Sequence, residues 1–107
     1  GIKPDWWKLG AQPSTAAWAH VERVIAAHDP FCRGVVLLGL EAPEAELEAA
    51  FAATKDAGIV KGFAIGRTIF NDTAEKWLAG SIDDQAAVDE MAGRFTRLAE
   101  AWKRARA

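Results

Sequence analysis

The feature that most constrains the fold is a continuously apolar run, Gly34-Val35-Val36-Leu37-Leu38-Gly39-Leu40. Its β-branched start and its lack of alternation are typical of a strand covered on both faces, as in a parallel sheet. Two further mostly apolar runs lie at 4–9 and 60–66, and segments with helical spacing follow all three. This alternation predicts an α/β fold with parallel strands near 4–9, 34–40 and 60–66 and helices near 14–28, 43–57, 73–79 and 83–104.

The helical segments carry their own boundary signals. Ser14 or Thr15 is placed to cap the first helix. That helix is expected to stop near Asp29-Pro30, because proline disfavours helical geometry in the residue before it. Asp83-Asp84 is a predicted N-cap followed by a favourable charge, and Gly58 is a predicted helix stop.

Apolar residues at spacings of three and four define the faces that we expect to be buried. In the second helix these residues are Leu47, Ala50, Phe51 and Thr54. In the last helix they are Val88, Met91, Phe95, Leu98 and Trp102. Met91 and Phe95 are therefore expected to belong to the core rather than to a cofactor site.

Composition and charge exclude several classes of protein. Half of the 107 residues are hydrophobic, 26% are charged and the formal net charge is −2, which is ordinary for a globular chain and lacks the basic footprint of a nucleic-acid binder. No apolar run approaches the roughly 18 residues of a membrane span, and no signal pattern opens the chain. The single cysteine, Cys32, fits a reducing compartment. We expect a cytoplasmic protein with neither nucleic acid nor membrane as partner.

Three parallel strands make a narrow sheet with open edges and little surface for the helices to pack on. A (β/α)8 TIM barrel needs about 250 residues, and a long C-terminal helix lies where such a barrel closes. We therefore expect residues 1–107 to be a single fragment, the C-terminal three β-α units of a TIM barrel. The open edges also predict self-association or association with the missing part of the barrel.

Lys8 is the candidate catalytic residue, because it stands near the carboxyl end of a predicted strand between Trp7 and Leu9. Apolar surroundings lower the pKa of a lysine, and the neutral amine can then attack a carbonyl group to form a Schiff base. The alternatives are a lysine paired with a carboxylate and a lysine that extends from the top of the barrel into solvent.

Gly66 and Arg67 form a candidate phosphate site at the end of the third strand. Glycine allows the backbone to approach a phosphate closely, and arginine adds a bidentate clamp. Gly39, at the end of the preceding strand, could supply the other half of this cradle. The alternative is an ion pair between Arg67 and the C-terminal helix.

The remaining polar residues give weaker signals. Glu41, Thr68 and Asp72 could position a substrate or orient Lys8, but their spacing does not distinguish them from helix caps. His20 and His28 lie eight residues apart, and no third ligand is spaced to join them. We therefore expect no metal site, and we predict no cofactor.

The stretches PDWWKL, RGVVLLGLEAPEAEL and VKGFAIGRTIF together resemble the C-terminal, DUF2090-type domain that accompanies 5-dehydro-2-deoxygluconokinase in bacterial myo-inositol catabolism. The resemblance covers nearly the whole chain. That domain is similar to class I, tagatose-bisphosphate-type aldolases, in which a sixth-strand lysine forms a Schiff base with a dihydroxyacetone-phosphate unit and an eighth-strand Gly-Arg pair binds phosphate.

The resemblance implies that Lys8 is the Schiff-base lysine and that Gly66-Arg67 binds the phosphate of the sugar substrate. The implied reaction is cleavage of 2-deoxy-5-keto-gluconate 6-phosphate into dihydroxyacetone phosphate and malonate semialdehyde. Gly10-Ala11 stands where such aldolases tend to carry a glutamate, and the earlier strands are absent. We therefore expect a carbon–carbon lyase only in a longer parent protein, with this chain inactive alone.

A second interpretation stays open. The chain could be a noncatalytic association or regulatory module of a fused sugar kinase, with Lys8 held in an ion pair. Phosphoryl transfer itself cannot reside in these residues, because they contain no kinase phosphate loop.

Overall fold

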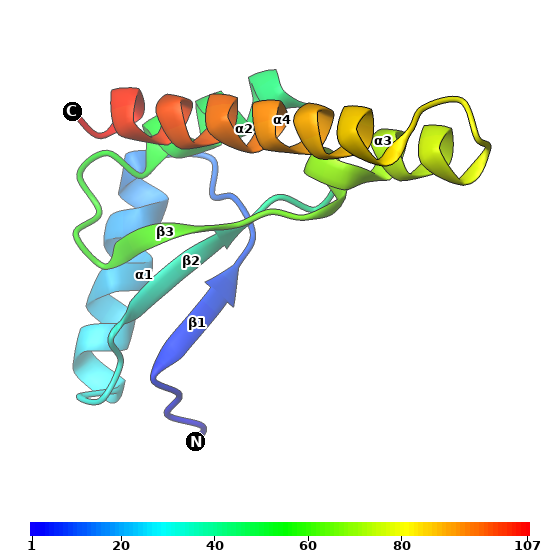
Figure 1. Cartoon of the computed structure of the whole chain (residues 1–107). Helices are drawn as coiled ribbons and strands as arrows, with labels where there is room; N and C mark the ends of the chain where they lie inside the picture. The colour runs from blue at the N-terminus through cyan, green and yellow to red at the C-terminus, as the bar shows by residue number, and fades with distance from the viewer.

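The computed structural model describes all of residues 1–107 and contains three parallel strands and four helices (Figure 1). The strands are β1 (Trp6–Leu9), β2 (Gly34–Leu38) and β3 (Val60–Ala64), and the helices are α1 (Thr15–His28), α2 (Glu44–Ala53), α3 (Arg67–Leu78) and α4 (Asp84–Ala105). The order of the strands in the sheet, β1-β2-β3, is their order along the chain. The predicted α/β class with a parallel sheet is confirmed.

The helices cover one face of this sheet. Val35 and Leu37 of β2 are fully buried, and as alternate residues of a strand they point to the same side. On that side they join one core cluster with Trp18 of α1, Phe51 of α2 and Leu98 of α4. Figure 1 shows α1 behind the strands and no helix in front of them.

The opposite face of the sheet is not covered by this chain. Trp7 packs against the core cluster, so its neighbours Trp6 and Lys8 point to the uncovered face. Gly34 lies close to side chains there, because a Cβ atom at this position would stand 2.8 Å from Cζ3 of Trp6 and 2.6 Å from Cγ of Lys61. Trp6 and Trp7 therefore point to opposite faces of the sheet.

The molecule is elongated. Its extents are 51 × 29 × 18 Å and its radius of gyration is 16.1 Å, compared with about 13 Å for a compact domain of this length. In Figure 1, α3 and the first turns of α4 extend beyond the sheet. None of the four helices has both the length and the apolar character of a membrane span.

Several element boundaries differ from the predicted ones. The helix expected at 73–79 begins at Arg67, directly after β3, because Gly66 can serve as its N-cap. The helix expected at 43–57 ends at Ala53, since the Thr54 hydroxyl donates to the carbonyl of Phe51 (2.7 Å) and turns follow, so Gly58 is not its stop. Each strand is also two residues shorter than expected.

Other boundary predictions are confirmed. The Ser14 hydroxyl accepts a hydrogen bond from the Ala17 N–H (3.2 Å), and the Asp83 carboxylate accepts one from the Ala86 N–H (2.8 Å). Both side chains are therefore N-caps. Helix α1 ends at the predicted place, with Asp29 as its C-cap.

The apolar face of α4 is only partly buried. Leu98 is 1% exposed and belongs to the core cluster, and Trp102 packs against it. Val88 and Phe95, which we expected in the packing face, are 54% and 53% exposed. The prediction was wrong for these two residues: Val88 lies in the first turns of α4, which extend beyond the sheet, and Phe95 meets Phe63 of β3 (ring centroids 6.3 Å apart) but keeps half of its side chain exposed.

A polar network joins α3 to α4 where no sheet supports them. The Asp72 carboxylate accepts from Arg94 (2.6 Å) and pairs with Lys76 (3.1 Å). Glu90 accepts from the Thr73 hydroxyl (2.8 Å) and from Lys76 (3.3 Å). The hydrogen bond from Arg94 is the main cause that lowers the pKa of Asp72, and the bond from Thr73 is the main cause for the lowered pKa of Glu90.

We expect acid to loosen the contact between α3 and α4. A carboxylate with a lowered pKa stabilises the fold above its ordinary value, here 3.8 for Asp72 and 4.5 for Glu90, and this contribution is lost as the pH falls below those values. The protection factors of the α3 amides, that is, their exchange rates divided into those of an unfolded chain at the same pH, should therefore fall below about pH 4 when followed from pH 6 downwards by nuclear magnetic resonance (NMR). An Asp72→Asn variant should exchange faster already at pH 6 and should show a smaller further change on acidification.

Candidate functional site

The carboxyl ends of β2 and β3 form a hollow of about 260 Å³, lined by residues 38–41, 64–68 and Phe70. Ligand and catalytic sites of parallel α/β folds lie at this edge of the sheet. Three of the predicted site residues, Gly39, Gly66 and Arg67, all line the hollow. They meet there because the ends of neighbouring parallel strands lie side by side.

One wall of the hollow is an unusual turn after β2. The Ala42 N–H donates to the Gly39 carbonyl (3.0 Å), which closes a four-residue turn. Its two central residues, Leu40 and Glu41, have φ values of 48° and 63°. Turns with positive φ at both central positions ordinarily use Asn and Gly, and such values are unfavourable for other residues. The turn presents the Glu41 side chain to the hollow.

Gly39 is required by packing. A Cβ atom there would lie 2.9 Å from Cγ1 of Ile65, which is closer than side chains tolerate. The glycine thus allows the ends of β2 and β3 to approach each other. This role accounts for Gly39 without any ligand, whereas the hollow beside it leaves a ligand role open.

The opposite wall is the first turn of α3. The N–H groups of Gly66, Arg67 and Thr68 donate to no backbone oxygen, because a helix has no internal acceptors for its first N–H groups. These donors and the positive end of the helix dipole favour an anion at this position. The local structure is therefore suited to a phosphate group.

Arg67 forms an ion pair with Glu41 across the hollow. The side chains of Arg67 and Glu41 are 57% and 53% exposed, so the pair is solvated. The partner of Arg67 thus lies in the turn after β2 and not in the C-terminal helix, which was the alternative to a phosphate role. The Thr68 hydroxyl donates to the Ala42 carbonyl (2.9 Å) and ties the same turn to α3.

Lys8 lies at the penultimate position of β1 on the uncovered face of the sheet, and its side chain is exposed. Its sequence neighbours Trp7 and Leu9 pack towards the helices on the other side. The apolar surroundings that we expected from these neighbours are therefore missing, because successive strand residues point in opposite directions. No carboxylate forms a salt bridge with Lys8 within the chain.

The other candidate residues lie elsewhere or have structural partners. Asp72 is held by Arg94 and Lys76 between α3 and α4. His20 and His28 are exposed on α1, and neither lines the hollow. They contribute nothing to the hollow.

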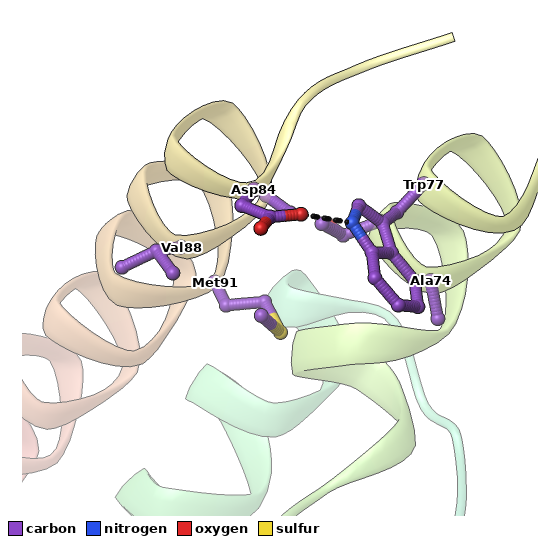
Figure 2. A pocket seen from close by; sticks show the side chains of 7 residues that line it. Ala74, Trp77, Asp84, Val88 and Met91 are labelled. Carbon is purple, nitrogen blue, oxygen red and sulfur yellow. Dashed lines mark hydrogen bonds between the residues drawn. The ribbon is translucent and has the colours of Figure 1, made fainter. Parts of the chain in front are cut away.

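A second cleft, of about 290 Å³, lies between α3 and α4 (Figure 2). Its walls are mostly apolar and include Ala74, Val88 and Met91. The indole N–H of Trp77 donates to the Asp84 carboxylate (2.8 Å), as Figure 2 shows. Because its only carboxylate is engaged in this way, the cleft offers no free group for catalysis. The hollow at the sheet edge is the better candidate.

Reasoning from sequence missed the turn at Leu40 and Glu41. The only local signal was Gly39 at the end of an apolar run, since neither central position carries the Asn or Gly that such turns prefer. The pairing of Glu41 with Arg67 follows from this turn. The sequence therefore could not predict this ion pair either.

The family comparison covers almost the whole chain. The model of a family described as "Uncharacterized protein conserved in bacteria (DUF2090)" matches residues 1–106. No curated protein and no solved structure matches the chain.

Proposed function

The chain belongs to the DUF2090 family of bacterial proteins, and from this premise we propose that it is part of a phosphosugar aldolase of the Schiff-base class. In this proposal the chain supplies the last three β-α units of a (β/α)8 barrel. Lys8 is the nucleophile, and Gly66 and Arg67 bind the substrate phosphate. The full protein acts in myo-inositol catabolism, linked to 5-dehydro-2-deoxygluconokinase.

The one-sided sheet is the observation that carries this proposal. Parallel sheets are almost always covered on both faces, and doubly wound sheets carry helices on both. Here the strands follow chain order and all the packed helices lie on one side. In a barrel, the face without helices becomes the interior. Lys8 is on that face, where further strands would remove it from bulk water.

The hollow beside α3 supports the phosphate part of the proposal. Barrel enzymes frequently bind phosphate in the loops after the last two strands, at the N-terminus of a short helix. The free N–H groups of residues 66–68 and the Arg67 guanidinium have the donors needed for a phosphate monoester. Leu40 lies between this hollow and the residue that follows β1, because its Cδ1 is 3.5 Å from the position that a Cβ atom of Gly10 would take.

The proposed reaction is a retro-aldol cleavage of 2-deoxy-5-keto-gluconate 6-phosphate. The neutral amine of Lys8 attacks the C5 ketone, and loss of water gives an iminium ion. A base removes the C3 hydroxyl proton, the C3–C4 bond breaks, and its electron pair moves to the iminium to form an enamine. Malonate semialdehyde leaves; protonation and hydrolysis of the enamine then release dihydroxyacetone phosphate and restore Lys8. The base must come from the strands that complete the barrel.

A noncatalytic association module of a sugar kinase is the second candidate. The observation that favours it is the exposure of Lys8 together with large exposed apolar side chains, which suit docking better than chemistry. The two candidates differ in whether Lys8 reacts with a ketose phosphate.

Borohydride trapping of the full-length protein distinguishes the two candidates. With dihydroxyacetone phosphate, reduction of the Schiff base should leave a covalent adduct on the Lys8 peptide, detected by mass spectrometry. A Lys61→Arg variant is the matched control, because Lys61 is also exposed near the uncovered face and should not affect the adduct. Absence of the adduct, together with full activity of a Lys8→Ala variant, would exclude the aldolase.

A further inference from the structure

The guanidinium proposed to bind phosphate already holds an anion. Glu41 pairs with Arg67 at the mouth of the hollow, and both side chains are more than half exposed. Exposed ion pairs contribute little to stability, so the two groups separate and re-form readily. The pair therefore restrains the site without closing it permanently.

The position of the Glu41 carboxylate follows from the backbone rather than from chance rotation of a surface side chain. The φ value of 63° at Glu41 and that of 48° at Leu40 both belong to the left-handed region. The end of the turn is fixed, since the Ala42 carbonyl accepts the Thr68 hydroxyl (2.9 Å). The turn thus holds the Glu41 carboxylate beside the guanidinium of Arg67, the first residue of α3.

We propose that Glu41 is a specificity residue that holds the Arg67 guanidinium of the hollow through its ion pair until a phosphate monoester displaces it. This inference rests on the proposed function, because it presupposes that the hollow binds phosphate. A phosphate dianion has three oxygens and about two charges, so it can engage Arg67 and the free N–H groups of residues 66–68 together. Uncharged sugars lack this advantage and leave Glu41 in place.

Replacement of the carboxylate by a neutral group tests the inference. Inorganic phosphate is titrated into the ¹⁵N-labelled chain at constant ionic strength, and the amide signals of Gly66, Arg67 and Thr68 are followed by NMR. Glu41→Gln should tighten binding by about threefold, the size expected when an exposed ion pair no longer competes. Glu46→Gln is the matched control, because this exposed α2 residue makes the same charge change without contacting Arg67.

The possible outcomes distinguish failure of the Glu41 inference from failure of the phosphate site itself. Tighter binding in Glu41→Gln but not in Glu46→Gln supports the inference, as does binding that appears only in Glu41→Gln. Phosphate binding that Glu41→Gln leaves unchanged or weakens overturns the inference and leaves the phosphate site intact. If neither the wild-type chain nor Glu41→Gln binds phosphate at these amides, the phosphate site fails and the inference fails with it.

Discussion

Replacement of Phe51 by alanine is expected to bring the chain close to unfolding at room temperature. Phe51 is fully buried between the sheet and α4. Its ring stacks on Phe63 of β3 with centroids 5.2 Å apart and meets the edge of Trp102 of α4 at 5.3 Å. One side chain thus joins three elements of the fold.

The expected loss is large relative to the total stability. Phe→Ala substitutions in cores cost about 3–5 kcal/mol, and domains are stable by only about 5–15 kcal/mol. This chain should lie at the low end of that range, because only 16 of its 107 residues are buried. Urea unfolding followed by near-ultraviolet circular dichroism should show little folded baseline for Phe51→Ala.

Two further variants keep this expectation testable if Phe51→Ala is too unstable to measure. Phe51→Leu retains most of the buried volume and should unfold at a moderately lower urea concentration. Phe95→Ala makes the same change on α4, where the side chain is 53% exposed, and should cost about 1 kcal/mol or less. Equal losses for Phe51→Ala and Phe95→Ala would show that burial of the Phe51 ring does not hold the core together.

The parallel sheet could be predicted from sequence because its central strand carries a local signature. Val35 and Leu37 alternate with Val36 and Leu38, so both faces of β2 are apolar. The caps Ser14 and Asp83 were predictable for a similar reason, since their hydroxyl and carboxylate bind N–H groups only three residues away. Such interactions depend on short-range chemistry.

The periodicity of apolar residues in a helix does not predict which element of the fold covers the apolar face of that helix. The spacing of Val88, Phe95 and Leu98 describes one apolar stripe along α4. Whether each residue is buried depends on what packs over it, and of these three residues only Leu98 is fully covered. The start of α3 was missed because Arg67, Thr68 and Asn71 lack an apolar pattern, although Gly66 allowed the chain to turn directly into a helix.

The candidate site was predictable in part. Gly39, Gly66 and Arg67 meet because strand order places the ends of β2 and β3 side by side, and topology follows from the β-α alternation. The sequence left open whether Lys8 is exposed. It is exposed because β1 is an edge strand in which Trp7 and Leu9 point away from the lysine.

The chain alone is expected to self-associate. Its uncovered sheet face and both open strand edges carry unpaired backbone groups and exposed apolar side chains. The large exposed apolar residues include Trp6 on the sheet face, Leu40 at the carboxyl edge, and Val88 and Phe95 on α4. A stable protein interface buries about 1,600 Å² in total, a modest part of the 6640 Å² that this chain exposes.

Sedimentation equilibrium is the measurement for this expectation. The weight-average mass should rise above that of one chain as the concentration increases, because association follows mass action. Trp6→Lys adds a charge to the uncovered face and should shift association to a higher concentration by about tenfold, the effect of losing one aromatic contact at an interface. Ala45→Lys adds the same charge on the exposed side of α2 and should leave association unchanged. A single species of monomer mass at every concentration would mean that the uncovered face is stable in water, and the reason for expecting further strands against it would be lost.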